Sequence, residues 1–302
     1  MTTHTDSVEL VPNNGWDSRI LVCRCGKLVS TFIVVTTHYV IMVDTLINKA
    51  TASALLAIAA PHLAGRQLLV INTHADWDHA WGNHVFAGPD STISAPIIAS
   101  QQCAKRLRTQ EMAEGLRSMR GNAPERFNDV RLTPPTLLFD QQFTIDGGDL
   151  TLELFATPGH TADHVAIYLP EIRTLLAGDA AELPFPFVES AESLPLLRDS
   201  LARMAALKPA YALYCHAPVT SGPTVLAQNI TYFDMVEQRC RTALANGISP
   251  QLVDDNDIEE LVKFPYADAI PTDMDADELA NFYRPGHRGA LRAMLEYLSN
   301  TE

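Results

Sequence analysis

Hydrophobic residues along the chain fall into many short runs separated by polar turns. Residues 28–35 and 39–43 are rich in β-branched and aromatic side chains, and the polar segment between them predicts a β-hairpin. Alanine and leucine recur at helical spacing over residues 49–64, which predicts a helix. Residues 67–72 form a short apolar run that predicts a strand leading into a polar loop.

The same mixture of short strands and helices continues along the chain. Further strands are expected at residues 92–98, 136–143, 150–156, 165–169, 173–177 and 210–215, and helices at 100–120, 191–207, from about 224 onward, and last at about 289–298. This order lacks the regular strand–helix alternation of a doubly wound sheet or a β/α barrel. The pattern favours an α/β chain with two layers of sheet and helices outside them.

Composition narrows the class of protein. The 302 residues include 47% hydrophobic and 19% charged residues, which argues against long disorder. The formal net charge of -14 argues against sequence-independent nucleic-acid binding, because phosphate contacts need clustered Lys and Arg. The first residues are polar, no apolar run is long enough for a membrane span, and the five cysteines are scattered. We therefore expect a reduced, cytoplasmic protein without nucleic-acid or membrane partners.

The negative charge is concentrated near the C-terminus. Residues 254–278 contain ten acidic side chains and one basic one, Lys263. This segment holds nine of the 14 net negative charges and predicts a solvated face or linker. The basic residues of 105–120, in contrast, lie on a predicted helix, for which a solvated surface is favoured over a cap on a site.

One polar loop carries the strongest chemical signal. His74, Asp76, Asp78 and His79 lie within six residues, directly after the strand expected at 67–72. In an extended backbone, His74, Asp76 and Asp78 point to the same side. Imidazole nitrogens and carboxylate oxygens are the usual ligands of zinc, iron and manganese, and a cation would remove the repulsion between the two aspartates. The loop predicts a metal site.

Four more residues of the same types follow or end predicted strands, and they are Asp44, His160, Asp179 and His216. Loops at the ends of strands are a common source of binding and catalytic residues, so these side chains are expected to join the metal loop. His164 lies four residues after His160 and is expected to hydrogen-bond a substrate or a metal ligand.

In order and spacing, these motifs resemble the metallo-β-lactamase fold hydrolases over roughly residues 15–220. The resemblance implies an αββα four-layer sandwich with a helical C-terminal extension. The expected catalytic domain covers residues 1–245, and residues 246–302 form an acidic, mainly helical extension that packs on it. The resemblance further implies two divalent metal ions at one edge of the sandwich.

The resemblance also implies a role for each candidate residue. The first metal would be held by His74, Asp76 and His160; the second by Asp78, His79 and His216; and Asp179 would bridge both. Asp44 would orient a ligand without binding metal itself. Asp78 is the expected catalytic proton acceptor as well as a ligand.

Asp76 departs from the family pattern, which has histidine at this position. The change gives the site three carboxylates, which favours harder ions, so iron or manganese joins zinc, the first expectation. A glutamate occupies the same loop position in the flavodiiron branch of the fold, but this chain has neither room nor a glycine-rich signature for a flavodoxin domain. The shorter side chain could also leave the first metal weakly bound.

The expected activity is metal-dependent hydrolysis of a small molecule. A metal-bound hydroxide would attack an ester, lactone, thioester or phosphoester. The alternative is a di-iron redox or oxygenase protein on the same fold, motivated by Asp76, and a third hypothesis is a binding module without catalysis. A homodimer is left open as an assembly. The substrate depends on loops whose shape the sequence does not predict.

Overall fold

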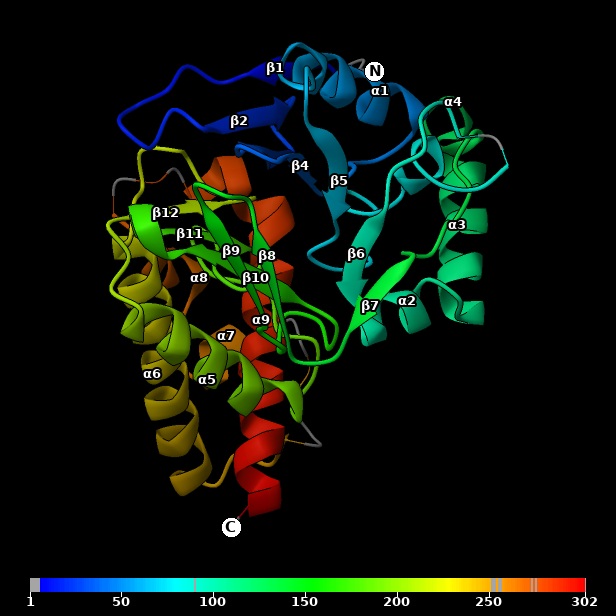
Figure 1. Cartoon of the computed structure of the whole chain (residues 1–302). Coiled ribbons are helices and arrows are strands. Elements are labelled where there is room, and N and C mark those ends of the chain that lie inside the picture. The colour runs from blue at the N-terminus through cyan, green and yellow to red at the C-terminus, as the bar shows by residue number, and fades with distance from the viewer. Residues whose placement is uncertain are drawn as a thin grey trace.

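The computed structural model describes residues 6–89, 91–250, 254, 257–272, 274 and 276–301 (Figure 1). Two β-sheets pack face to face, and helices cover the outer face of each. The predicted four-layer αββα sandwich is therefore confirmed.

The first sheet has seven strands in the order β1-β2-β3-β4-β5-β6-β7. These are β1 (Val8–Leu10), β2 (Ile20–Cys25), β3 (Val29–Val35), β4 (Tyr39–Val43), β5 (Gln67–Ile71), β6 (Ile97–Ser100) and β7 (Leu137–Phe139). Neighbouring strands are antiparallel from β1 to β4 and parallel from β4 to β7. Because β4 and β5 are parallel, Asp44 and the metal loop leave the sheet at the same edge.

The second sheet has five strands in the order β12-β11-β10-β9-β8. These are β8 (Gln142–Asp146), β9 (Thr151–Ala156), β10 (Val165–Leu169), β11 (Thr174–Gly178) and β12 (Tyr211–Tyr214). Strand β10 is antiparallel to β9 and β11, and β12 is parallel to β11. Strands β9, β11 and β12 thus run in one direction, so the residues after them, His160, Asp179 and His216, meet at one edge.

Helices form the two outer layers. The first group, between the strands of the first sheet, comprises α1 (Lys49–Ala59), α2 (Gln101–Arg106), α3 (Gln110–Asn122) and α4 (Pro124–Phe127), with short 3-10 turns η1 (Ala60–His62) and η2 (Asn83–Val85). The second sheet carries η3 (Pro170–Ile172), α5 (Ser193–Ala206), α6 (Thr224–Ala245), α7 (Ile258–Leu261), α8 (Tyr266–Ala269) and α9 (Ala276–Thr301). Figure 1 shows α9, in red, lying beside α6.

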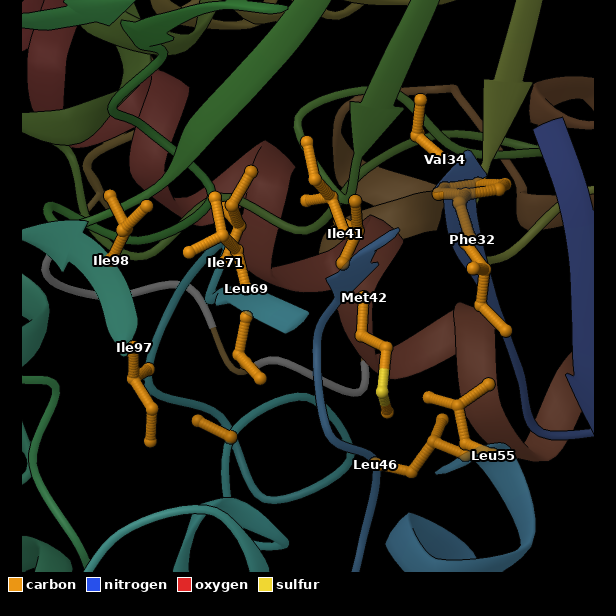
Figure 2. Packing of buried hydrophobic residues seen from close by; sticks show 14 of the residues in the cluster. Phe32, Val34, Ile41, Met42, Leu46, Leu55, Leu69, Ile71, Ile97 and Ile98 are labelled. Atoms are coloured by element: carbon orange, nitrogen blue, oxygen red, sulfur yellow. The ribbon is translucent and has the colours of Figure 1, made fainter. Parts of the chain in front are cut away.

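Alternation along the strands divides the core in two. In Figure 2, Ile41 and Ile71 point toward the strands of the second sheet, whereas Met42 points toward Leu55 of α1. In β10, Ile167 belongs to the core between the sheets and Ala166 to the core under the helices. Successive strand side chains face opposite ways, so each buried sheet supports both layers.

The C-terminal extension packs into the helical core. Leu291, Leu295 and Leu298 of α9 are buried in the same cluster as Leu197 of α5 and Val236 of α6. Of the acidic segment, Asp255, Asp273 and Asp275 lie outside the described residues. Among its described side chains, Asp254, Asp257, Glu260 and Asp268 are exposed, but Glu259 is partly buried and pairs with Arg288 at 2.6 Å.

Several element boundaries differ from the prediction. The helix expected at 100–120 divides into α2 and α3, because Thr109 caps a new helix by accepting from the Met112 N–H. The strand expected at 136–143 is two strands, one in each sheet. The terminal helix begins at Ala276 and includes Pro285. Among the described residues, no helix is long and apolar enough to cross a membrane.

Candidate metal centre

Asp179, directly after β11, lies at the centre of four histidines. Its Oδ2 atom is 3.2 Å from the Nε2 atoms of His79 and His216, and 3.7 Å from those of His74 and His160. The side chain of Asp179 is 5% exposed. Oxygen and nitrogen donors from both sheets therefore converge on one small volume, which is the position predicted for a bridging carboxylate.

The remaining ligands predicted for the second metal gather on one side of Asp179. Asp78 Oδ1 is 3.8 Å from His79 Nε2, and Asp78 Oδ2 is 3.6 Å from His216 Nε2. One donor atom from each of these three residues lies within 4.8 Å of the other two. We call Asp78, His79 and His216 the Asp78 half of the site.

On the other side of Asp179 lie His74, Asp76 and His160, which we call the Asp76 half. Asp76 Oδ2 is 3.5 Å from His74 Nε2 and 3.8 Å from His160 Nε2. The other oxygen of Asp76, Oδ1, pairs with Arg106 Nη1 at 2.6 Å. Asp76 thus presents one oxygen to the histidines while the second is held by a guanidinium.

The prediction of a solvated basic surface at 105–120 is wrong for Arg106. It is the last residue of α2, its side chain is 30% exposed, and Nη1 also lies 3.2 Å from Asp163 Oδ1. Asp163 is buried and accepts the Ala75 N–H at 2.7 Å. A site cation from α2 was missed because only the tertiary fold places this helix end beside the metal loop.

Asp44 holds the metal loop in place. Its backbone has a φ of 62°, a left-handed conformation that is costly for a non-glycine residue. The carboxylate accepts hydrogen bonds from the Thr73 N–H at 2.7 Å and the Thr73 hydroxyl at 2.8 Å. Its Oδ2 also lies 2.8 Å from His79 Nδ1, so it orients that ring with Nε2 toward Asp179.

His164 supports Asp179 from beneath. Its Nε2 accepts the Asp179 backbone N–H at 3.0 Å, and its Nδ1 lies 2.7 Å from the Thr157 hydroxyl. Gly178 makes this contact sterically feasible, because a Cβ there would lie 2.5 Å from His164 Nε2. Its φ of 58° also favours glycine. The structure therefore places His164 next to a predicted ligand.

Several buried polar atoms face this volume without a hydrogen-bond partner among the described residues. They include His74 Nε2, His79 Nε2, His160 Nε2 and Asp179 Oδ1. Buried polar groups are normally paired, so unpaired donors that converge indicate a missing bonding partner. Imidazole and carboxylate donors in this arrangement fit divalent metal ions.

The charged groups of the site strongly shift the pKa values of His160, His216 and Asp179. Burial opposes the charged form of His160 and His216, yet nearby acidic groups, chiefly Asp76 and Asp179 respectively, raise the pKa of His160 to about 9 and that of His216 to about 10. Burial opposes the charge of Asp179 too, but His79 and His216 hold its pKa well below the ordinary value. The same donors that pair with protons would pair with metal cations.

Glu182 and Tyr283 border the Asp76 half and were not among the predicted site residues. Glu182 is 1% exposed, and its Oε1 lies 3.9 Å from His160 Nδ1. The Tyr283 hydroxyl of α9 donates to Glu182 Oε2 at 3.0 Å. Burial raises the pKa of Glu182 to about 7, although the charge of His216 opposes this shift. In the sequence, only its position three residues after Asp179 distinguishes Glu182 from the other acidic residues.

Three residues that neighbour the candidate ligands in the sequence have other surroundings, and they are Cys215, Trp77 and Trp81. Cys215 is buried, and its Sγ lies within 4.8 Å of donor atoms of Asp44 and His79. Burial raises its pKa, so it is a poor nucleophile. Trp77 and Trp81 both pack edge-on against Phe127 of α4.

Comparison with known proteins agrees with this architecture. Hydroxyacylglutathione hydrolase of Erythrobacter litoralis (strain HTCC2594) is 29% identical over 145 residues, 48% of this chain and 46% of that protein. Beta-lactamase-like protein 2 homolog of Caenorhabditis elegans is 30% identical over 152 residues, 50% of this chain and 43% of that protein. The chain thus spans less than half the length of these curated relatives.

Solved structures share the fold at low sequence identity. A metallo-beta-lactamase family protein from Thermus thermophilus superposes with a TM-score of 0.61 at 21% identity, over 97% of this chain and 93% of that one. The sequence profile of the metallo-beta-lactamase superfamily matches residues 26–216, well over half of the chain and every residue of both halves of the site. The chain belongs to the metallo-beta-lactamase superfamily.

Proposed function

We propose that this protein is a metal-dependent hydrolase that cleaves an ester-type bond, namely an ester, lactone, thioester or phosphoester, of a small molecule. The observation that carries the proposal is the position of Asp179 Oδ2, between 3.2 and 3.7 Å from four histidine Nε2 atoms. Three of those nitrogens are buried and lack another partner among the described residues. Two ions, zinc as the first candidate, would occupy the Asp78 half and the Asp76 half.

The residues of the site divide the remaining work. Metal ions held there would polarise a carbonyl or phosphoryl oxygen and lower the pKa of water. Asp78, with a side chain 10% exposed, is the proposed proton acceptor because it keeps some access to solvent while its two oxygens face the neighbouring histidines. Asp44 fixes the tautomer of His79, and His164 fixes the backbone of Asp179.

Arg106 weakens the case for a different metal chemistry. Three carboxylates, those of Asp76, Asp78 and Asp179, favour iron or manganese only if all three charges act on the metals. The guanidinium of Arg106, 2.6 Å from Asp76 Oδ1 and shared with Asp163, offsets part of one of them. The charge of the centre then approaches that of a site with histidine at position 76, which supports zinc hydrolase chemistry over a di-iron redox protein.

Thioesters are the first substrate class to test. A relative named hydroxyacylglutathione hydrolase matches about half of this chain, and that name describes hydrolysis of an acylated glutathione. The match covers 46% of the relative, so the substrate of this chain is a separate question. Lactone, carboxylic ester and phosphodiester probes complete the panel.

The proposal is tested with purified protein assayed for metal content and for turnover of the four probes. We expect bound zinc and hydrolysis of at least one ester-type probe, with turnover lost in Asp78→Ala. Asp129→Ala, which removes an exposed carboxylate from the loop after α4, is the control and keeps full turnover. Two equivalents of iron with a redox-active absorption band and no hydrolysis would favour the di-iron alternative.

A further inference from the structure

The four histidines around Asp179 each point Nε2 toward the centre of the site. The Nδ1 atom of each ring then faces away from the centre and needs a hydrogen-bond partner there. His79 Nδ1 meets Asp44 Oδ2 at 2.8 Å, His74 Nδ1 meets the Thr73 hydroxyl at 3.0 Å, and His216 Nδ1 meets the Leu28 carbonyl at 2.8 Å. Such partners fix the tautomer and direction of a ligating ring. Three of the four rings are therefore already oriented by the first sheet and the loop after it.

His160 is the exception. Its Nδ1 is buried and makes no hydrogen bond among the described residues. The acid on that side is Glu182, whose Oε1 lies 3.9 Å away, beyond hydrogen-bond distance. A rotation of the His160 ring toward Glu182 would shorten this distance, and Glu182, at 1% exposure, has almost no contact with solvent to stabilise its charge.

The second oxygen of Glu182 is held from the C-terminal extension. Tyr283 donates its hydroxyl to Oε2, and the ring of Tyr283 packs against Phe185 and Phe187 in the loop that follows Glu182. Phe187 fits against α9 because Gly286 has no side chain: a Cβ there would lie 2.4 Å from the Phe187 ring. This Tyr283–Gly286 part of α9 therefore fixes the position of the glutamate.

The backbone of Glu182 is fixed as well. Asn229 of α6 accepts the Glu182 N–H at 3.0 Å and donates to the Glu182 carbonyl at 2.8 Å. With main chain and Oε2 both held, Oε1 remains for His160. A tether between helix and loop alone would not need a buried carboxylate, which is costly to desolvate unless it is paired.

We infer that Glu182 is the positioning residue for His160, accepting its Nδ1–H when metal is bound, and that Tyr283 makes the C-terminal helix part of this arrangement. The inference rests on the proposed function, since it takes His160 as a metal ligand. It assigns Tyr283 of α9 a role in the Asp76 half. It also explains why a helix remote in sequence reaches the centre.

The test measures metal binding and spectra of the full-length protein loaded with Co²⁺. Glu182→Leu removes the acceptor at similar size, Glu182→Gln keeps an acceptor without charge, and Tyr283→Phe removes only the hydroxyl. We expect the weaker of two Co²⁺ affinities to fall ~10- to 100-fold in Glu182→Leu, as for other orienting partners. Smaller losses are expected in Glu182→Gln and Tyr283→Phe.

A second readout follows the ring proton itself. In water, the Co²⁺ protein should show a shifted, exchangeable proton from the His160 Nδ1–H, and Glu182→Leu should lose it or speed its exchange. The matched control is Tyr232→Phe, which removes a buried hydroxyl that pairs with His287 in the same aromatic cluster but away from Glu182. Both affinities and all proton signals should survive in that variant.

The outcomes separate the two proposals. Absence of Co²⁺ or Zn²⁺ binding to the wild type would overturn the proposed function. Wild-type binding of two ions, with Glu182→Leu and Tyr283→Phe lowering only the unfolding temperature, would overturn the present inference and leave a structural tether. Folding of each variant is checked by circular dichroism, and Glu182→Gln, the least disruptive change, decides the matter if Glu182→Leu fails to fold.

Discussion

The two halves of the centre are built differently although they share Asp179. In the Asp78 half, the partners behind His79 and His216 are Asp44 and the Leu28 carbonyl, both from the first sheet and its edge. In the Asp76 half, Asp76 is paired with Arg106 of α2, and His160 faces Glu182, which Tyr283 of α9 holds. The Asp78 half depends on the sandwich, and the Asp76 half depends on the helices around it.

This difference indicates which half of the site can change more easily. The side chains of Asp78, His79 and His216 are at most 10% exposed, whereas that of Asp76 is 28% exposed. Strand ends hold side chains rigidly, while surface helices and their loops vary more easily. We therefore expect the Asp76 half to bind its metal more weakly and to be the half that tunes activity.

The largest effect is expected from Asp179→Ala, because this residue serves both halves. Loss of the central oxygen should release both metals and reduce turnover by more than the ~10- to 100-fold that follows loss of an orienting partner. Metal analysis and kinetics check the result. If one metal and measurable turnover remain, the halves are more independent than their geometry indicates.

Removal of the metals should leave positively charged histidines in both halves, because nearby carboxylates raise the pKa values of His79, His160 and His216. In metal-free protein, the raised pKa values of His160, about 9, and His216, about 10, stabilise the fold fully below the unfolded value of 6.5. That contribution is lost as pH rises toward 9 and 10, by an amount on the order of a few kcal/mol. Urea unfolding of chelator-treated protein from pH 6 to 10 should show the decline.

In metal-loaded protein the sign reverses, because protons compete with the metals for the same nitrogens. Stabilisation by metal should therefore grow between pH 6 and 9. His160→Gln should remove the part of the metal-free decline that ends near pH 9 and keep the part that ends near pH 10. Parallel curves for metal-free wild type and His160→Gln would contradict the account.

Gly178→Ala tests the contact between His164 and the backbone of Asp179, the residue that both halves share. Its Cβ would lie 2.5 Å from His164 Nε2, at a φ of 58°. Gly222→Ala is the matched control, since its φ is 62° and nothing lies within 4 Å of its Cβ. The left-handed backbone should cost each variant about 1–2 kcal/mol, and the clash should cost Gly178→Ala about 2 kcal/mol more. Equal free energies of unfolding would show that His164 moves aside freely.

The smallest effect is expected from Arg106→Gln, which removes the cation beside Asp76 and Asp163 and touches no ligand of the Asp78 half. Without the guanidinium, Asp76 keeps its full charge, so the weaker metal should bind about tenfold more tightly, a change of 1.4 kcal/mol. Lys105→Gln removes an exposed positive charge from the same helix and should change little. A loss of affinity in Arg106→Gln would mean that Arg106 chiefly holds Asp76 in position.

The sequence predicted the sandwich and the residues that meet at its edge. The metal loop is local, and strand ends after β9, β11 and β12 converge because those strands run the same way. The resemblance supplied the order of His160, Asp179 and His216 along the chain. These features could be predicted because they depend on local hydrophobic patterns and on the order of motifs along the chain, both of which can be read from one sequence.

The partners behind the ligands could not be predicted in the same way. Arg106 lies in a polar stretch that is typical of a solvated helix, and only tertiary packing brings it to Asp76. The sequence predicts a last helix from about residue 289, whereas α9 begins at Ala276 and contains Pro285. In the structure Gly286 admits the Phe187 ring, and α9 runs on past it. Contacts between distant segments decided each case.

The most direct test is the number of metals in purified wild-type protein and the order in which a chelator removes them. The account predicts two equivalents, with one released well before the other, and the early release should be the step altered in Arg106→Gln and Glu182→Leu. A protein that binds no metal, or that releases two equivalents together in the wild type and in both variants, would contradict it.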